Sequence, residues 1–238
     1  AEKLAVVAFL SVNTFVCLEL LIQLYILFKR RTSMYFWSLL VTILGALFAV
    51  PFCILFVWYP AQYPVLSAVG IAVLYTIISV GNSLVLYSRL HLVTRGLKPR
   101  WVLWMIIGST VVIQLPHLVL LPAAAATEAP RFTAPEQIIG HLAVTAYAVR
   151  EFIILGVYAY EVVRNLRPLI YIRGTEGKRL IVYLVVAGSV AFLLDTAIMV
   201  FDYRLSPAIV AGFIPFVSTV KVKVEFASLN KLVHFMRS

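Results

Sequence analysis

Seven apolar stretches, each long enough to cross a bilayer, occupy nearly all of this 238-residue chain. A bilayer core of about 30 Å needs roughly 20 helical residues at ~1.5 Å rise per residue. Hydrophobic residues make up 63% of the chain and the mean hydropathy is +1.00, which excludes an ordinary soluble domain. The sequence therefore predicts an all-α, polytopic membrane protein, a seven-transmembrane-helix bundle forming a single domain over residues 1–238. The expected spans are 4–28, 34–58, 65–90, 101–122, 138–163, 179–203 and 207–230.

Basic residues gather in alternate connections of this bundle. The connections after the first, third and fifth spans hold most of them, whereas the opposite side holds only Arg131 and Arg204. Because cytosolic loops carry an excess of Lys and Arg, this pattern predicts a lumenal or external N-terminus and a cytosolic C-terminus. Contact of these residues with lipid headgroups also explains the net charge of +10, so nucleic-acid binding is not expected. The basic residues of the predicted cytosolic side are Lys29, Arg30, Arg31, Arg95, Lys98, Arg100, Arg164, Arg167, Arg173, Lys178 and Arg179.

Local signals within and between the spans are few. Residues 122–137, PAAAATEAPRFTAPEQ, predict an irregular lumenal connection because of their Pro content. Pro116 predicts a kink in the fourth span. Cys17 and Cys53 both fall inside spans, where they act as small apolar residues, so neither a disulfide nor a metal site is predicted.

Ionisable side chains inside the spans carry the functional argument, because a charged group in a bilayer is costly and marks a cavity or a partner. Counting along the helices places Glu151 about 20 Å down the fifth span and Asp195 about two-thirds of the way across the sixth. Asp202 follows Asp195 by seven residues, on the same face and nearer the lumenal edge. We expect these three acids to supply proton donors or acceptors.

Polar and aromatic residues at similar depth predict a pocket around these acids. Tyr147, Glu151 and Tyr158 share one face of the fifth span, whereas Arg150 points away from it, because adjacent helical residues diverge by about 100°. The expected pocket residues are His117, Tyr147, Tyr158, Phe192 and Asn13.

A second group of charges lies toward the predicted cytosolic side. Lys221 and Glu225 are spaced to pair along the last span. We expect a structural network that joins helices through neutralised charge rather than chemistry. Its members are Glu19, Arg89, Lys221, Lys223 and Glu225.

Three functions fit a bundle with buried acids. In an enzyme, a protonated carboxylic acid opens an epoxide or protonates an alkene, and aromatic faces stabilise the resulting carbocation. A receptor or sensor would use the charges as a switchable network, and a structural membrane protein would use them only to join helices. A retinal protein is disfavoured because Lys221 lies near the cytosolic end of its span. Motifs for Mg²⁺-bound diphosphate, diiron sites and phosphate loops are missing from the sequence, so catalysis without a metal or cofactor is expected.

Four segments add a resemblance to these arguments. The sequence resembles a fungal family of seven-span integral membrane proteins, which is itself similar to the membrane-bound terpene cyclases of the ascofuranone and macrophorin pathways. The likeness covers most of the chain and rests on SLVLYSRLHLV at 83–93, EFIILGVYAYEVVRNLRP at 151–168, LLDTAIMV at 193–200 and VSTVKVKVEFASLNKLV at 217–233.

This resemblance implies acid-initiated cyclisation of a prenylated aromatic or other isoprenoid, a meroterpenoid precursor, in the endoplasmic reticulum or another endomembrane. The partners that it implies are this lipophilic small molecule and the bilayer. Arg150 is a departure, because the family carries a polar amide immediately before the glutamate. The residues implied by position are Glu151, Asp195, Arg89, Lys221, Lys223 and Glu225.

Overall fold

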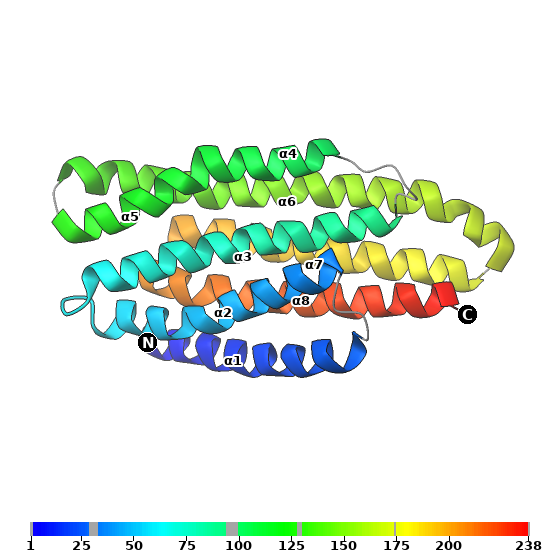
Figure 1. The fold of residues 1–238 in the computed structure, drawn as a ribbon, viewed down its shortest axis with the longest axis horizontal. Coiled ribbons are helices and arrows are strands. Elements are labelled where there is room, and N and C mark those ends of the chain that lie inside the picture. The colour runs from blue at the N-terminus through cyan, green and yellow to red at the C-terminus, as the bar shows by residue number, and fades with distance from the viewer. Residues whose placement is uncertain (1, 29–32, 94–99, 128–129, 174, 238) are drawn as a thin grey trace.

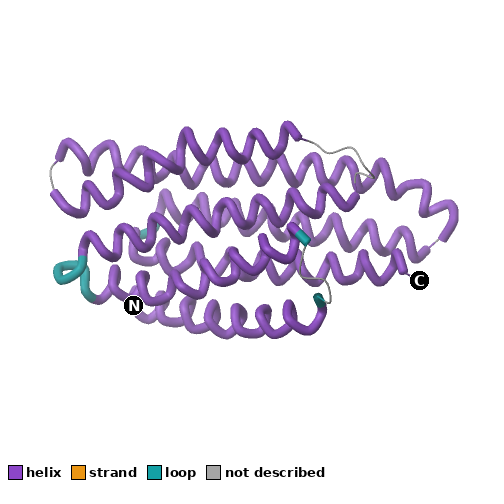
Figure 2. Tube along the Cα trace, in the orientation of Figure 1, coloured by secondary structure: helices purple, strands orange, loops and turns teal. Residues whose placement is uncertain are grey.

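The computed structural model describes the backbone of residues 2–28, 33–93, 100–127, 130–173 and 175–237, and it describes side chains except within 91–93, 130–133, 165–173, 175–180 and 229–237. Every regular element in these ranges is a helix (Figure 2). The elements are α1 (Glu2–Leu27), α2 (Met34–Trp58), α3 (Pro64–Val93), α4 (Arg100–Ser109), the π-helix η1 (Thr110–Gln114), α5 (Leu115–Thr127), α6 (Pro130–Arg173), α7 (Thr175–Arg204) and α8 (Pro207–Arg237).

The helices lie side by side along one long axis (Figure 1). Within the described residues, seven segments are long and apolar enough to cross a membrane, with α4, η1 and α5 together forming the fourth. Because the number of crossings is odd, α1 begins at one end of the bundle and α8 ends at the other (Figure 1). The predicted seven spans are therefore confirmed as helices, and each matches its expected range closely.

The structure tests one of the two predictions about the connections between spans. The irregular connection predicted over residues 122–137 is wrong, because α5 continues to Thr127 and α6 begins at Pro130. Its alanines are strong helix formers, and Pro130 occupies a helix start, where a missing N–H costs nothing. Of the eleven basic residues behind the predicted orientation, the five at 29–31, 95 and 98 lie outside the described residues, and those at 167, 173, 178 and 179 lie where only the backbone is described.

Close helix approaches occur at glycines. A Cβ on Gly81 of α3 would lie 2.1 Å from Thr42 Oγ1 of α2, and a Cβ on Gly70 would lie 2.0 Å from the Phe52 ring. Only glycine permits these contacts, so α2 and α3 pack backbone against side chain along most of their length. Apart from α2, α3 also contacts α5, α6 and α8, which makes it the central helix of the bundle.

Polar side chains also join α1 to its neighbours. Asn13 donates to the Ala46 carbonyl of α2 at 3.0 Å and accepts from Thr219 Oγ1 of α8 at 2.6 Å. Cys17 lies 3.5 Å from the same Thr219 hydroxyl. Asn13 is fully buried among three helices, so the expectation that it lines a substrate pocket is wrong; its amide is used to satisfy neighbouring backbone and hydroxyl groups.

Candidate active site

A buried ion cluster joins the last three helices near the middle of the bundle. The Lys221 ammonium on α8 contacts the Glu151 carboxylate on α6 and lies 2.5 Å from Asp195 Oδ1 on α7. Glu151 and Asp195 are both 0% exposed, so water does not take part in neutralising them. The backbones of α6 and α8 make no close approach within the described residues, and the long lysine side chain spans the gap between them.

Hydrogen bonds hold this cluster to α3. Tyr147 Oη accepts from Lys221 Nζ and from Asn82 Nδ2, each at 3.1 Å, and Asn82 also donates to Ser218 Oγ at 2.6 Å. One oxygen of each carboxyl group, Glu151 Oε1 and Asp195 Oδ2, has no hydrogen-bond partner among the described residues. The predicted face of Tyr147 and Glu151 is therefore confirmed as polar and inward-facing.

Arg150 points away from Glu151, as the helical spacing predicts. Its guanidinium donates to Ser79 Oγ at 2.7 Å, to the Ser79 carbonyl at 2.9 Å and to Ser109 Oγ at 3.1 Å. Gln114 also donates to Ser79 Oγ, at 2.5 Å. Arg150 thus joins α6 to α3 and to the fourth span.

The fourth span contains the π-helix η1 rather than a simple kink. The Leu115 N–H bonds to the Thr110 carbonyl, five residues back. Pro116 has no N–H and its ring would clash with the carbonyl four residues before it, so a wider turn removes the conflict. The extra residue in this turn places Gln114 toward α3, where it is 2% exposed.

A cavity of about 430 Å³ lies at the end of the bundle where α6 and α8 begin and α7 ends. Its polar wall includes Asp202 and His141, whose Oδ2 and Nδ1 atoms are 2.6 Å apart. His117 and Glu136 also line it, and His117 packs edge-on against Tyr75 with centroids 6.0 Å apart. Most other lining residues are apolar, so the cavity offers a few ionisable groups to an otherwise hydrophobic occupant.

The cavity and the ion cluster lie on the same faces of three helices. Glu151 follows the cavity residue Val144 by seven residues on α6, and Lys221 follows Ile214 by seven on α8. On the antiparallel α7, Asp195 precedes Asp202 by the same interval. Seven residues are almost two helical turns, so the cluster lies about 10 Å deeper than these cavity residues.

An apolar layer fills the space between the two sites. Val144, Ile198 and Val217 belong to one buried cluster together with Tyr75 and Tyr147. Of the three predicted acids, Asp202 therefore faces the cavity, whereas Glu151 and Asp195 lie beneath this layer in the ion cluster.

The predicted pairing of Lys221 with Glu225 is wrong. Glu225 contacts Arg89 of α3 instead, and Arg89 also contacts Ser228. Lys221 reaches across the bundle because two fully desolvated carboxylates attract it more strongly than a single neighbour on its own helix. Lys221 therefore joins helices through neutralised charge, as expected, but its partners lie on α6 and α7.

The other predicted members of that network are paired with opposite charges. Lys223 Nζ lies 2.5 Å from Glu19 Oε2, and Glu19 also accepts from Gln23. Glu19 and Glu225 thus each contact a cation on another helix, through Lys223 and Arg89. These two pairs join α1 to α8 and α3 to α8.

Two predicted pocket residues lie away from the cavity. Tyr158 sits under Arg89, with the guanidinium carbon 5.2 Å from the ring centroid. Phe192 stacks on Phe152 with centroids 4.3 Å apart and is 46% exposed on the outer side of α7. Both border a separate groove between α6 and α7, so the expectation that they share a pocket with His117 is wrong. Their turns of α6 and α7 lie deeper than the helix ends that form the cavity.

The sequence interpretation missed Glu136 and His141. Both follow helical spacing back from Glu151 through Val144, on the face that the interpretation had already identified as polar. Extending that face toward the start of α6 would have found them. The predicted irregular connection over 122–137 hid Glu136, because it placed this residue outside the helix.

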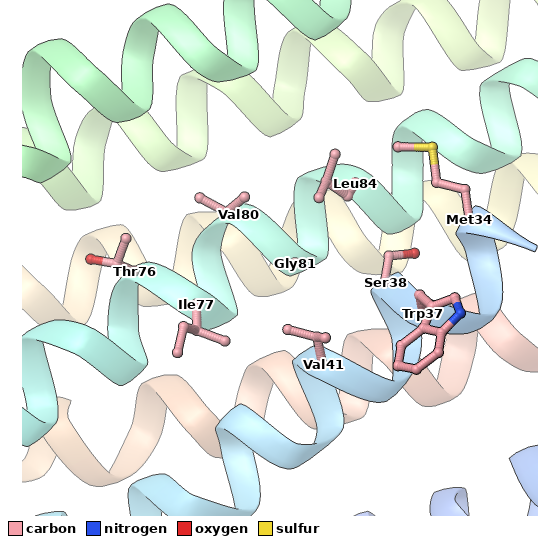
Figure 3. Close-up of a pocket in the computed structure, with 9 residues that line it drawn as sticks. All are labelled: Met34, Trp37, Ser38, Val41, Thr76, Ile77, Val80, Gly81 and Leu84. Atoms are coloured by element: carbon pink, nitrogen blue, oxygen red, sulfur yellow. The ribbon is translucent and has the colours of Figure 1, made fainter.

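Another cavity of about 430 Å³ lies between α2 and α3 (Figure 3). Trp37 and Met34 stand at one end and Gly81 forms part of its floor, as Figure 3 shows. Its lining includes no ionisable side chain, so it offers no acid–base chemistry. Among the described residues, no group of three or more His, Cys, Asp or Glu side chains is arranged to hold a metal ion.

Comparisons with known proteins place the chain in a family. Searches of curated proteins and of solved structures each returned no significant match. A family described as a domain of unknown function, DUF7703, matches over residues 1–238, the whole length of the sequence. The chain therefore belongs to the DUF7703 family.

Proposed function

We propose that this protein is a membrane-bound terpene cyclase that cyclises a prenylated meroterpenoid precursor by acid catalysis. The observation that carries the proposal is the apolar cavity of about 430 Å³ with the hydrogen-bonded Asp202 and His141 on its wall. This volume lies within the usual range of about 300–1,000 Å³ for ligand sites. A substrate that fills this cavity would displace its water, which would otherwise quench a carbocation as an alcohol.

The reaction is an isomerisation in which one proton enters and one leaves. A carboxylic acid protonates a terminal epoxide oxygen or alkene carbon, and the electron-poor carbon is attacked by the next double bond of the folded chain. Ring closure moves the positive charge along the chain, and a base finally removes a proton to form the product alkene. Asp202 is the proposed donor and the His141 imidazole is the proposed acceptor, and the proton taken up by His141 returns to Asp202 along their hydrogen bond, which restores both groups for the next turnover.

Glu151 and Asp195 are the alternative donors, held about 10 Å deeper by Lys221. If the substrate tail displaces the apolar layer around Val144 and Ile198, it reaches the free oxygens of these two carboxyl groups. The two arrangements differ in which carboxyl group must carry the proton, and substitution of each acid separates them.

The test uses microsomes from yeast expressing the protein, supplied with epoxidised and unepoxidised farnesyl-phenols. Asp202→Asn is expected to abolish formation of cyclised product while the protein keeps its normal elution profile in detergent. Asp195→Asn and Glu151→Gln test the deeper donors in the same assay, and Glu19→Gln, at a partly exposed ion pair, is the matched control. Full turnover in Asp202→Asn, Asp195→Asn and Glu151→Gln would refute the acid assignment.

We also propose that the N-terminus is lumenal and the C-terminus cytosolic, in the endoplasmic reticulum or another endomembrane. The basic residues of alternate connections support this orientation. The cavity would then open toward the lumen. Glycosylation acceptor sites inserted after Tyr59 and after Arg100 should be modified only at the first position; the reverse result would invert the topology.

A sensor without catalysis is the second candidate. Lys221 supports it, because this one side chain on α8 contacts carboxylates on both α6 and α7, so its release would change the contacts of all three helices. Failure to convert any prenylated substrate, combined with a ligand-dependent change in protease sensitivity, would favour this function over the cyclase.

A further inference from the structure

A second polar pair in the cavity is not used by the proposed chemistry. Glu136 and His117 stand on either side of Gly140, near the start of α6. A Cβ on Gly140 would lie 3.7 Å from Glu136 Oε1 and 3.8 Å from His117 Cε1. The absence of a side chain at Gly140 therefore leaves a space bordered by a carboxylate and an imidazole.

Both groups lack the partners that buried polar atoms normally have. His117 is 9% exposed, and its Nδ1 atom has no hydrogen-bond partner among the described residues. Glu136 is half-buried and makes no ion pair within the part of the chain that the structure describes. Buried polar atoms are almost always satisfied, so the unpartnered nitrogen of the buried His117 ring, next to a half-buried carboxylate without an ion pair, points to a missing ligand.

The charge of Glu136 determines which ligand fits the space beside Gly140. A carboxylate repels an anion, and a neutral alcohol does not compensate its charge. A protonated amine does compensate it, since it donates a charge-assisted hydrogen bond to Glu136 and packs against the edge of the His117 ring. The Tyr75 ring, which lines the same cavity, adds the aromatic face that favours a cation.

The remaining lining residues indicate what the other end of the ligand is like. Asp202 is already hydrogen-bonded to His141 through Oδ2, whereas Glu136 makes no ion pair among the described residues. Leu121 of α5 and Val210 and Ile214 of α8 form part of its apolar wall. An occupant therefore needs a hydrophobic tail attached to a single donor head.

We propose that this cavity binds a lipophilic primary or secondary amine in its protonated form. The ammonium group lies between Glu136 and His117 in the space beside Gly140, and the apolar tail extends along the walls formed by α5 and α8. This inference does not rest on the proposed cyclisation, because it concerns binding alone.

Equilibrium dialysis of radiolabelled octylamine against the protein in lipid nanodiscs tests the proposal, with empty nanodiscs subtracted for partitioning into lipid. Saturable binding is expected for octylamine, with displacement by unlabelled octylamine but not by octanol or octanoate. Glu136→Gln should weaken binding at least about tenfold. Glu2→Gln removes an exposed carboxylate from the same end of the bundle and should leave binding unchanged.

Gly140→Ala provides a second variant that keeps every charge. Its methyl group meets Glu136 and His117 only at ordinary contact distances, so the variant should fold, yet it fills the ammonium position. Loss of octylamine binding in Gly140→Ala is expected. Equal displacement by octanol, or unchanged affinity in both Glu136→Gln and Gly140→Ala, would overturn the proposal, whatever the outcome of the cyclisation assay.

Discussion

Replacing Lys221 with methionine removes the one cation that contacts Glu151 and Asp195 within the described residues. Methionine is a long unbranched side chain, so it fills much of the same space without the charge. The variant leaves two carboxyl groups close together at 0% exposure, where water does not solvate them. We expect a large loss of stability, because each group must be ionised without a partner or carry an extra proton.

The size of this effect follows from burial. Removing one partner of a buried ion pair typically costs about 3–5 kcal/mol. For a chain of this size, each kcal/mol lowers Tm by about 2–4 °C, so Lys221→Met should lower Tm by about 6–20 °C. Lys223→Met is the matched control, because the side chains of its pair with Glu19 are 42% and 31% exposed. Because helices enclose this pair only partly, Lys223→Met should lower Tm by less than Lys221→Met does.

Thermal denaturation of the detergent-purified variants, followed by size-exclusion chromatography of the soluble fraction, measures these differences. A triple variant, Lys221→Met with Glu151→Gln and Asp195→Asn, should recover much of the lost stability, because it removes the uncompensated charges together. A Tm for Lys221→Met within about 2 °C of that for Lys223→Met would refute the reasoning, since the buried cluster would then contribute no more than a surface pair.

Three further predictions concern helix packing, measured in the same thermal assay. Gly81→Ala should destabilise by about 1–3 kcal/mol, because its methyl group would lie 2.1 Å from Thr42 Oγ1, whereas Gly81→Ala combined with Thr42→Ala should recover part of the loss. Gly156→Ala should instead be neutral or stabilise by about 0.5–1 kcal/mol, because its added Cβ meets nothing within 4 Å; a clear loss would contradict the described packing. Asn13→Leu should cost about 1–3 kcal/mol by removing two buried hydrogen bonds, one to the Ala46 carbonyl and one from the Thr219 hydroxyl, which keeps the Pro215 carbonyl as its acceptor; a neutral result would show that these bonds contribute little.

The spans were predictable because a helix in lipid must satisfy its backbone hydrogen bonds internally, which makes long apolar runs a strong signal. The ends were less predictable. Residues such as Ala123 and Ala125 have high helix propensity, but the prolines around them suggested an irregular connection, and helix propensity prevailed. The π-helix at Thr110–Gln114 was not predicted, because Pro116 signals a disturbance without specifying whether the turn bends or widens.

Depth along each helix located the candidate acids, because rise per residue is constant. Partner choice was not predictable in the same way. Spacing within α8 suggested that Lys221 pairs with Glu225, yet its partners lie on α6 and α7, which approach only after the bundle assembles. The pairing of His141 with Asp202 was unpredictable for the same reason, because it joins positions 61 residues apart and no pattern within one helix reports such a contact.

Because the cavity and the ion cluster lie seven residues apart on the same three helices, a movement of one of these helices displaces residues of both sites. A helix moves as a nearly rigid rod, so a rotation of α6 that displaces Val144 displaces Glu151 by almost the same angle. In the same way, α7 connects Asp202 to Asp195, and α8 connects Ile214 to Lys221. A ligand that turns any of these helices therefore acts against the lysine contacts. If ligand binding and the lysine contacts are coupled in this way, a substitution that loosens those contacts also changes the affinity for the ligand, although it touches no atom of the cavity.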